Sequence, residues 1–171
     1  MGVTIHFEGK LKSDSDYEKV MLDAKAFAEA NKMEHEFFAE EEKLLLRHRE
    51  GEEWDYSGPT KGIKIQPHDN TDPLLLEFDS DNYIQEYCKT QFATTDIHIM
   101  IVAFLKSIEC YFENLKVNDE GEYWQTGDAA ILQNRIETCF YQIETLKQND
   151  PTLDGPYKTE SDRIVDLLHT N

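Results

Sequence analysis

The chain has 171 residues, of which 39% are hydrophobic, 30% charged and 11% aromatic. This length allows one hydrophobic core of ordinary size, and the apolar content is higher than in disordered chains, so we predict a single folded α+β domain over residues 1–171. The formal net charge of −18 at pH 7 disfavours binding to nucleic acid and to anionic membranes, because both attract cationic side chains.

Three features of the sequence indicate the cytoplasm as the compartment. The longest apolar stretch, residues 97–105, is much shorter than the roughly 20 residues that a membrane span needs. The N-terminal residues lack the basic start and the apolar run of a secretory signal. Cys88, Cys110 and Cys139 are odd in number and widely spaced, which is typical of reduced core thiols and not of a disulfide framework.

The start of the chain changes from strand periodicity to helix periodicity. Residues 3–9 alternate apolar and polar side chains, which predicts a strand with one buried face. Apolar side chains then recur at helical spacing after capping candidates at residues 13–16, and Asn31 offers an end to this amphipathic helix. The apolar positions of the helix are Tyr17, Val20, Ala24 and Phe27.

The middle of the chain has the pattern of an antiparallel meander. Residues 34–55 contain nine acidic and three basic residues around two apolar runs, and we interpret them as strands. Further strands are predicted at residues 63–65, 74–78 and 83–92, bounded by glycine, proline and polar residues. The Asp and Asn residues at 79–82 favour a hairpin turn, because they tolerate the backbone conformations that turns require.

Helical periodicity returns in the last part of the chain. A second helix begins after capping candidates at residues 94–96, and a third begins at Gly127-Asp128 and ends at Asp150-Pro151, with a short strand at 115–117 between them. A last short helix is predicted around Ile164, Leu167 and Leu168. The expected architecture is α+β, an antiparallel sheet of about five or six strands with two or three long helices packed mainly on one face.

Residues with the chemistry of a site lie on both sides of the second predicted helix. Lys89-Thr90-Gln91-Phe92 precedes the helix, and His98 lies in its first turn. Residues 119–128, Asp-Glu-Gly-Glu-Tyr-Trp-Gln-Thr-Gly-Asp, follow it and place four carboxylates and two large aromatic side chains in ten positions.

Together with residues 5–11, Ile-His-Phe-Glu-Gly-Lys-Leu, these segments resemble a family of small bacterial cytoplasmic proteins. That family shares a Lys-Thr-Gln-Phe segment before a helix with an early histidine, and an Asp-Glu-Gly-x-Tyr-Trp-x-Thr-Gly-Asp segment. The resemblance covers residues 3–128 in order and implies no function, because no activity is established for the family. It places a shared binding site or pocket at eight residues: Thr90, Gln91, His98, Asp119, Glu120, Tyr123, Trp124 and Asp128.

The 119–128 loop has two interpretations. A carboxylate beside an aromatic ring is partly desolvated, which raises its pKa and suits a general acid or base with His98 as its partner. In the other interpretation, Tyr123 and Trp124 pack the loop on the core, Asp128 caps the third helix, and His98 forms local hydrogen bonds. Capping and packing are the commoner roles of such residues, so we favour the second interpretation.

Known signatures of metal, cofactor and nucleophile chemistry do not occur in the sequence. The six histidines never pair at i, i+2 or i, i+4, and neither H-E-x-x-H nor C-x-x-C is present, so we expect no metal site. The glycine-rich phosphate loops and Gly-x-Ser-x-Gly are also missing, so we expect no cofactor and no serine nucleophile.

Two functions of different classes are compatible with these observations. The first is an acidic cytoplasmic binding or inhibitory protein of the immunity type for a basic protein partner, based on the net charge, the acidic segment 34–55 and the missing catalytic signatures. The second is a small enzyme or ligand-binding domain near His98 and the 119–128 loop, which requires those side chains to converge on a concave surface. We favour the first, which charge reversal tests at Glu40, Glu41, Glu42, Glu52 and Glu53.

Overall fold

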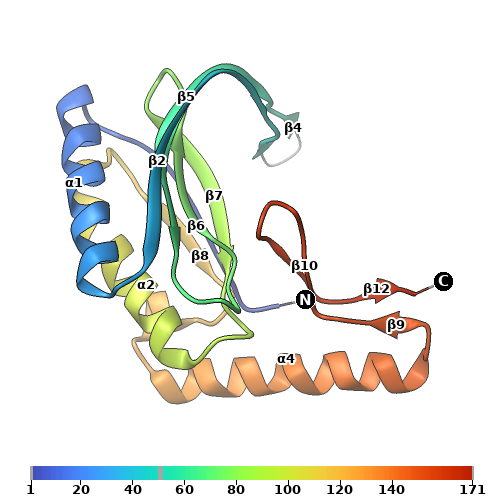
Figure 1. The fold of residues 1–171 in the computed structure, drawn as a ribbon. Helices are drawn as coiled ribbons and strands as arrows, with labels where there is room; N and C mark the ends of the chain where they lie inside the picture. Colours follow the sequence, from blue (N-terminus) through green and yellow to red (C-terminus); the bar gives the residue numbers. More distant parts are fainter. Residues whose placement is uncertain (1, 50–51, 171) are drawn as a thin grey trace.

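The fold is described from a computed structural model, over residues 2–49 and 52–170, with the side chains of residues 49–53 left out of the description. This part of the chain contains helices, longer strands and short strand pairs (Figure 1). In chain order the elements are β1 (Thr4–Lys10), α1 (Asp14–Ala30), β2 (Glu34–Leu45), β3 (His48–Arg49), β4 (Glu52–Glu53), β5 (Tyr56–Gln66), β6 (Leu74–Phe78), β7 (Tyr83–Lys89), α2 (Thr95–Ile108), the 3₁₀ turn η1 (Glu109–Tyr111), β8 (Lys116–Asp119), α3 (Tyr123–Thr126), α4 (Ala129–Asn149), β9 (Leu153–Asp154), β10 (Tyr157–Lys158), β11 (Ile164–Val165) and β12 (Leu168–His169).

Two antiparallel three-stranded sheets form the centre of the fold, with the strand orders β7-β1-β8 and β2-β5-β6. The prediction of an α+β fold with antiparallel strands is confirmed, whereas the prediction of one sheet of five or six strands is wrong. The division falls between β6 and β7, which lie side by side. There the carboxylate of Asp72 accepts hydrogen bonds from Lys89 N and Ile164 N, so a side chain replaces part of the expected ladder.

The local sequence explains where α1 begins and which face it buries. Ser13 is the N-cap, and its hydroxyl accepts a hydrogen bond from Asp16 N at 3.3 Å. Residues at helical spacing then face the core, and most of the predicted stripe belongs to them. The buried positions are Asp16, Tyr17, Val20, Met21, Ala24 and Ala28.

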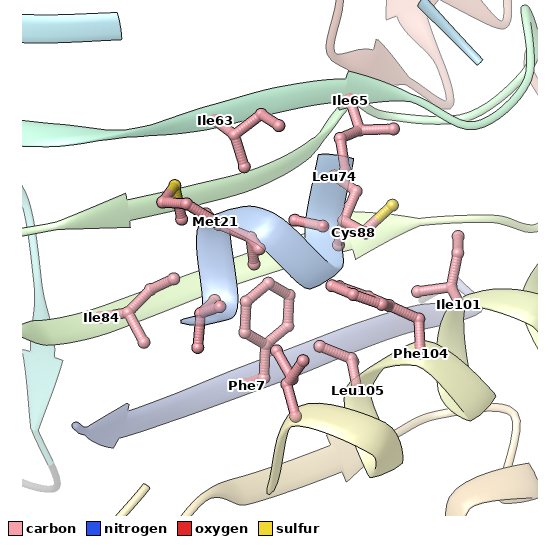
Figure 2. Packing of buried hydrophobic residues seen from close by; sticks show 14 of the residues in the cluster. Phe7, Met21, Ile63, Ile65, Leu74, Ile84, Cys88, Ile101, Phe104 and Leu105 are labelled. Atoms are coloured by element: carbon pink, nitrogen blue, oxygen red, sulfur yellow. The ribbon is translucent and has the colours of Figure 1, made fainter. Parts of the chain in front are cut away.

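The main core lies between the sheets and the helices α1 and α2, which cover one side of the molecule (Figure 1). Figure 2 shows Ile63 and Ile65 of β5 above α1, with Phe7 of β1 and Leu105 of α2 on its other side. All four side chains are at most 2% exposed, so removal of apolar surface from water stabilises this arrangement. A second buried cluster lies at the end of the sheets, where α4 packs against Val3.

The hairpin of β2 and β5 curls over the side of the molecule that faces away from α1 (Figure 1). Arg47, 2% exposed, fastens this arm to the β6–β7 turn. Its Nη1 donates to Asp79 Oδ2 at 2.7 Å and its Nη2 to the carbonyl oxygen of Tyr83 at 3.3 Å. Three aromatic rings surround the guanidinium, with centroids 4.9–5.7 Å away: Trp54, Tyr56 and Tyr83.

The C-terminal segment differs from the sequence prediction. The short helix predicted around Ile164, Leu167 and Leu168 is wrong, because β9–β12 form two short antiparallel pairs there. Polar contacts with the sheet hold this segment extended. Asp166 accepts hydrogen bonds from Lys89 Nζ at 2.7 Å and from Gln91 Nε2 at 2.9 Å, which a local helical pattern cannot reveal.

The three cysteines are free thiols in two environments. Cys88 and Cys139 are buried, as predicted for core thiols, and burial raises the pKa of both thiols. Cys110 is exposed in η1, so its prediction as a core thiol is wrong, because the apolar stripe of α2 ends at Ile108. Among the helices that the structure describes, none is both long and apolar enough to cross a membrane.

Candidate functional site

Three of the predicted site residues form one buried hydrogen-bonded chain. His98 lies in the first turn of α2, Thr90 directly follows β7, and Asp119 ends β8. His98 Nδ1 is 2.7 Å from Thr90 Oγ1, and His98 Nε2 is 3.1 Å from Asp119 Oδ2. Thr90 and His98 are 0% exposed and Asp119 is 3% exposed, so the three side chains meet inside the protein.

Asp119 organises the loop that follows it. Its Oδ1 accepts a hydrogen bond from Gly121 N at 2.7 Å, and its Oδ2 accepts one from Trp124 N at 2.8 Å in addition to the bond with His98. Burial opposes the charged carboxylate, but the hydrogen bond and the charge of His98 and the two backbone donors outweigh it and lower the pKa of Asp119 below 3.8. We infer that Asp119 is an ionised anchor and not a general acid.

The geometry accommodates both protonation states of His98. With a neutral ring, Nε2–H donates to Asp119 and Nδ1 accepts the hydroxyl proton of Thr90. With a charged ring, Nδ1–H donates to Thr90, whose hydroxyl then donates to the carbonyl oxygen of Val3 at 3.3 Å. In both states each ring nitrogen of His98 has a hydrogen-bond partner. The order of Thr90, His98 and Asp119 resembles that of a catalytic triad, but the three buried side chains leave no face open to a substrate.

The aromatic side chains of Tyr123 and Trp124 pack the loop on the core, and Tyr123 also contacts His98. The Tyr123 ring stands edge-on to the His98 ring, with centroids 6.5 Å apart. Both aromatic side chains are partly buried against the main core, and Lys106 Nζ lies 5.3 Å from the centroid of the Trp124 ring. These contacts correspond to the packing role considered from the sequence.

Gln91 and Glu120 lie beside the buried hydrogen-bonded residues and bind the backbone at the start of β1. Gln91 Oε1 accepts a hydrogen bond from Val3 N at 2.7 Å, and Glu120 Oε2 accepts one from Thr4 N at 2.9 Å. Burial opposes the charge of Glu120, but hydrogen bonds from His6 and Thr4 and the charge of His6 outweigh it and lower the pKa of this carboxyl. The two side chains therefore hold β1 in place.

Asp128 lies apart from the other predicted residues and serves α4. Its Oδ1 accepts hydrogen bonds from Ala130 N at 2.8 Å and Ile131 N at 3.4 Å, which makes it the N-cap of that helix. The structure thus brings Thr90, His98 and Asp119 together and leaves Asp128 in a separate local role.

Gly121 is the position in this loop where a larger residue would disturb the buried chain. A Cβ atom there would lie 2.6 Å from Leu132 Cδ1 and 3.0 Å from His98 Cε1. We expect Gly121→Ala to lower the free energy of unfolding by about 1–3 kcal/mol, because the packed side chains must shift. Urea unfolding measures the change, and an Ala variant as stable as the parent would contradict this packing.

The sequence did not indicate the hollows of the protein surface. Four hollows that we describe are lined by residues other than Thr90, His98 and Asp119. One of about 760 Å³ lies over β1, β7 and β8, and the alternation of His6 and Glu8 in β1 is a signal that could have indicated its floor. A smaller one of about 380 Å³ lies beside β2, between Glu40, Thr60 and Asp14.

Comparisons of the chain with protein-family models, with curated proteins and with solved structures found no match.

Proposed function

We propose that the protein is an acidic, cytoplasmic binding or inhibitory protein, and that its surface along β2 binds a basic protein. The observation that carries this proposal is a row of exposed glutamates on an edge strand. β2 pairs with β5 on one side, and within the described residues its other side has no strand partner. The exposed glutamates of β2 are Glu34, Glu36, Glu40, Glu41 and Glu42.

The cations nearest in the sheet are engaged elsewhere. Lys43 Nζ lies 2.8 Å from both carboxylate oxygens of Glu77, which is 2% exposed. Lys61 Nζ lies 3.9 Å from the centroid of the Tyr17 ring. Among the described residues, no Lys or Arg forms an ion pair with any of the five glutamates, so their charge remains available to an external cation.

β2 also carries exposed apolar side chains, and a hollow lies beside it. Phe37 is 53% exposed and Leu44 is 61% exposed on β2, and protein interfaces place such groups inside a polar rim. The 380 Å³ hollow is lined by one cation, Lys61, and by four carboxylates, which suits insertion of a Lys or Arg side chain. The carboxylates are those of Asp14, Glu40, Glu41 and Asp79. Negative charge on an edge strand also prevents strand-to-strand aggregation, and a binding test separates this protective role from recognition.

We expect the triple variant Glu40→Lys/Glu41→Lys/Glu42→Lys to lose a basic partner that the parent protein retains. The experiment compares proteins captured from a lysate of the cells in which the chain occurs, and then measures association rates with the purified partner. We expect the association rate to fall by roughly tenfold or more at low salt, because electrostatic steering is reversed. The side chains of Glu52 and Glu53 lie outside the described residues, so the variant leaves them unchanged.

A matched control reverses three exposed glutamates away from β2: Glu113, Glu137 and Glu144. It changes the net charge by the same amount and is expected to retain most of the partner. Equal loss in both variants would mean that net charge, and not the β2 surface, determines binding. An association rate unaffected by the β2 variant would contradict the proposal.

The alternative, an enzyme or ligand-binding domain near His98, receives less support from the geometry. A catalytic base must come within hydrogen-bond reach of the substrate proton, whereas the His98 and Asp119 side chains are 0% exposed and hydrogen-bonded to each other. We therefore interpret the hydrogen-bonded residues Thr90, His98 and Asp119 as a structural element of the binding protein.

A further inference from the structure

A second hollow lies on the side of the sheet β7-β1-β8 that faces away from α1 and α2, and its volume is about 760 Å³. The strand register places outward-facing side chains on its floor in two rows. The first row is Tyr87, His6 and Asn118, and the second is Gln85, Glu8 and Lys116. The β2–β5 arm and the C-terminal segment reach over this side of the molecule (Figure 1), and such a volume is in the range of small-molecule sites.

Both walls of the hollow are fixed to its floor. The Gln85 side chain accepts a hydrogen bond from His48 N at 2.8 Å and donates one to His48 O at 2.7 Å, which holds the arm. Arg163 from the C-terminal segment donates to Tyr87 O at 2.6 Å and to Glu86 Oε2 at 2.8 Å. A ligand would therefore meet a preformed site and would not need to order the walls.

The hollow exposes apolar and aromatic surface. Leu46 on the arm is 70% exposed, and Tyr87 on the floor is 42% exposed. The His6 ring lies 5.9 Å from the Tyr87 ring, and the Arg163 guanidinium lies 4.1 Å from the Tyr87 centroid. A flat ring placed against these groups would remove apolar surface from water and add aromatic contacts.

The polar groups left over in the hollow are mainly hydrogen-bond donors. Within the described part of the chain, the Lys116 ammonium, the Tyr87 hydroxyl and the Asn118 amide have no hydrogen-bond or ion-pair partner. The carboxylates of the lining are already bonded, Glu86 to Arg163 and Glu8 to Gln85 Nε2 at 2.9 Å. Donors without partners favour a ligand that has acceptors and negative charge.

We propose that this hollow binds a small aromatic anion, with its ring against Leu46 and Tyr87 and its acidic group at Lys116. Tyr87 and Asn118 lie two strands apart in the same row, which corresponds to about 10 Å at the usual strand spacing. Lys116 extends from the adjacent row. An aromatic anion with two fused rings would therefore reach from Tyr87 to the Lys116 ammonium. The lining residues that the structure describes carry two Lys or Arg and two Glu side chains, so together they are formally neutral, in a chain whose net charge is −18.

The first experiment is a fluorescence titration of the full chain with 8-anilinonaphthalene-1-sulfonate, an aromatic anion. Its neutral analogue, N-phenyl-1-naphthylamine, is titrated in parallel. We expect saturable binding of the anion, weakened roughly three- to fivefold by Lys116→Gln, because a partly exposed ion pair is lost. The same variant should leave the affinity for the neutral analogue unchanged, whereas Leu46→Ser should weaken both probes roughly tenfold through lost apolar contact.

Matched controls change similar side chains elsewhere. Lys106→Gln removes an exposed cation from α2, and Leu22→Ser removes a 67% exposed leucine from α1. All four altered side chains are at the surface, and circular dichroism with urea unfolding verifies that each variant is folded. Absence of saturable binding, or equal weakening by the control variants, would overturn the proposal.

Discussion

Asp119→Ala is expected to lower the free energy of unfolding by about 3–5 kcal/mol, the range found when one partner of a buried charged pair is removed. The carboxylate accepts hydrogen bonds from His98 Nε2, Gly121 N and Trp124 N. Alanine would leave all three donors without this partner, and unpaired buried donors lose their bonds to water without replacement. The loop between β8 and α4 should loosen with them.

Asp128→Ala provides the matched control, because it also removes one aspartate from the same loop region. Asp128 caps α4 at an exposed position, and loss of such a cap costs about 1 kcal/mol. Urea unfolding of both variants at pH 7 gives the comparison. Equal losses of stability would show that the buried chain of Thr90, His98 and Asp119 does not hold the fold together.

The lowered pKa of Asp119 adds a pH dependence to this prediction. A carboxyl whose pKa is lower in the folded state than in the unfolded state stabilises the fold above the unfolded pKa, near 4. That contribution disappears as the pH falls through the folded pKa, so the parent protein should lose stability below about pH 4. Asp119→Asn cannot titrate there and should show a smaller loss between pH 6 and pH 3, as urea unfolding at each pH would measure.

Arg47→Met is expected to lower the free energy of unfolding by a similar amount, about 3–5 kcal/mol. The side chains of Arg47 and Asp79 are 3% and 5% exposed, and their ion pair joins the β2–β5 arm to the β6–β7 turn. Methionine fills the space among the aromatic rings but leaves the charge of Asp79 buried without its cation. Thermal and urea unfolding would detect the loss.

A double variant separates loss of the pair from loss of packing. In Arg47→Met/Asp79→Asn the buried charge is gone, and the Asn Oδ1 can still accept hydrogen bonds from Asp81 N and Tyr83 N as Asp79 Oδ1 does. We expect the double variant to regain most of the lost stability, since Arg47 Nε is a buried nitrogen without a hydrogen-bond partner in the described structure.

Arg135→Met is the control for an ion pair at the surface. Arg135 and Glu122 form a similarly short pair, at 2.6 Å against 2.7 Å for Arg47 and Asp79, but their side chains are 50% and 43% exposed. Solvent screens such a pair, and we expect a change of at most about 1 kcal/mol. A loss as large as that of Arg47→Met would contradict the assignment of the stabilisation to burial of the Arg47 pair.

The two networks differ from the proposed binding surfaces in their burial. Asp119 and Arg47 are buried and hydrogen-bonded, whereas the β2 glutamates and the floor of the 760 Å³ hollow are at the surface. Variants of the first kind should therefore change stability, and variants of the second kind should change binding while the fold remains intact. This separation makes the proposed functions testable in folded protein.

The sequence by itself determined the elements that have a periodic pattern of apolar residues or a capping residue. The stripe through Val20 and Ala24 indicated α1, the alternation at residues 3–9 indicated β1, and Asp128 was correctly placed before α4. Periodicity and capping are local properties, so they can be recognised without knowledge of the chain's path. Thr90, His98 and Asp119 are three of the eight predicted site residues, but the sequence did not indicate how they are arranged.

Only the tertiary structure decided how distant segments meet. Asp72 lies where the two three-stranded sheets divide and bonds to Lys89 and Ile164, and the pairing of Arg47 with Asp79 joins residues 32 positions apart. The C-terminal residues looked helical but are held extended by contacts with Lys89 and Gln91. The burial of His98 is likewise a consequence of packing, because a polar residue in a helix becomes inaccessible only when other elements cover it, and local sequence does not contain that information.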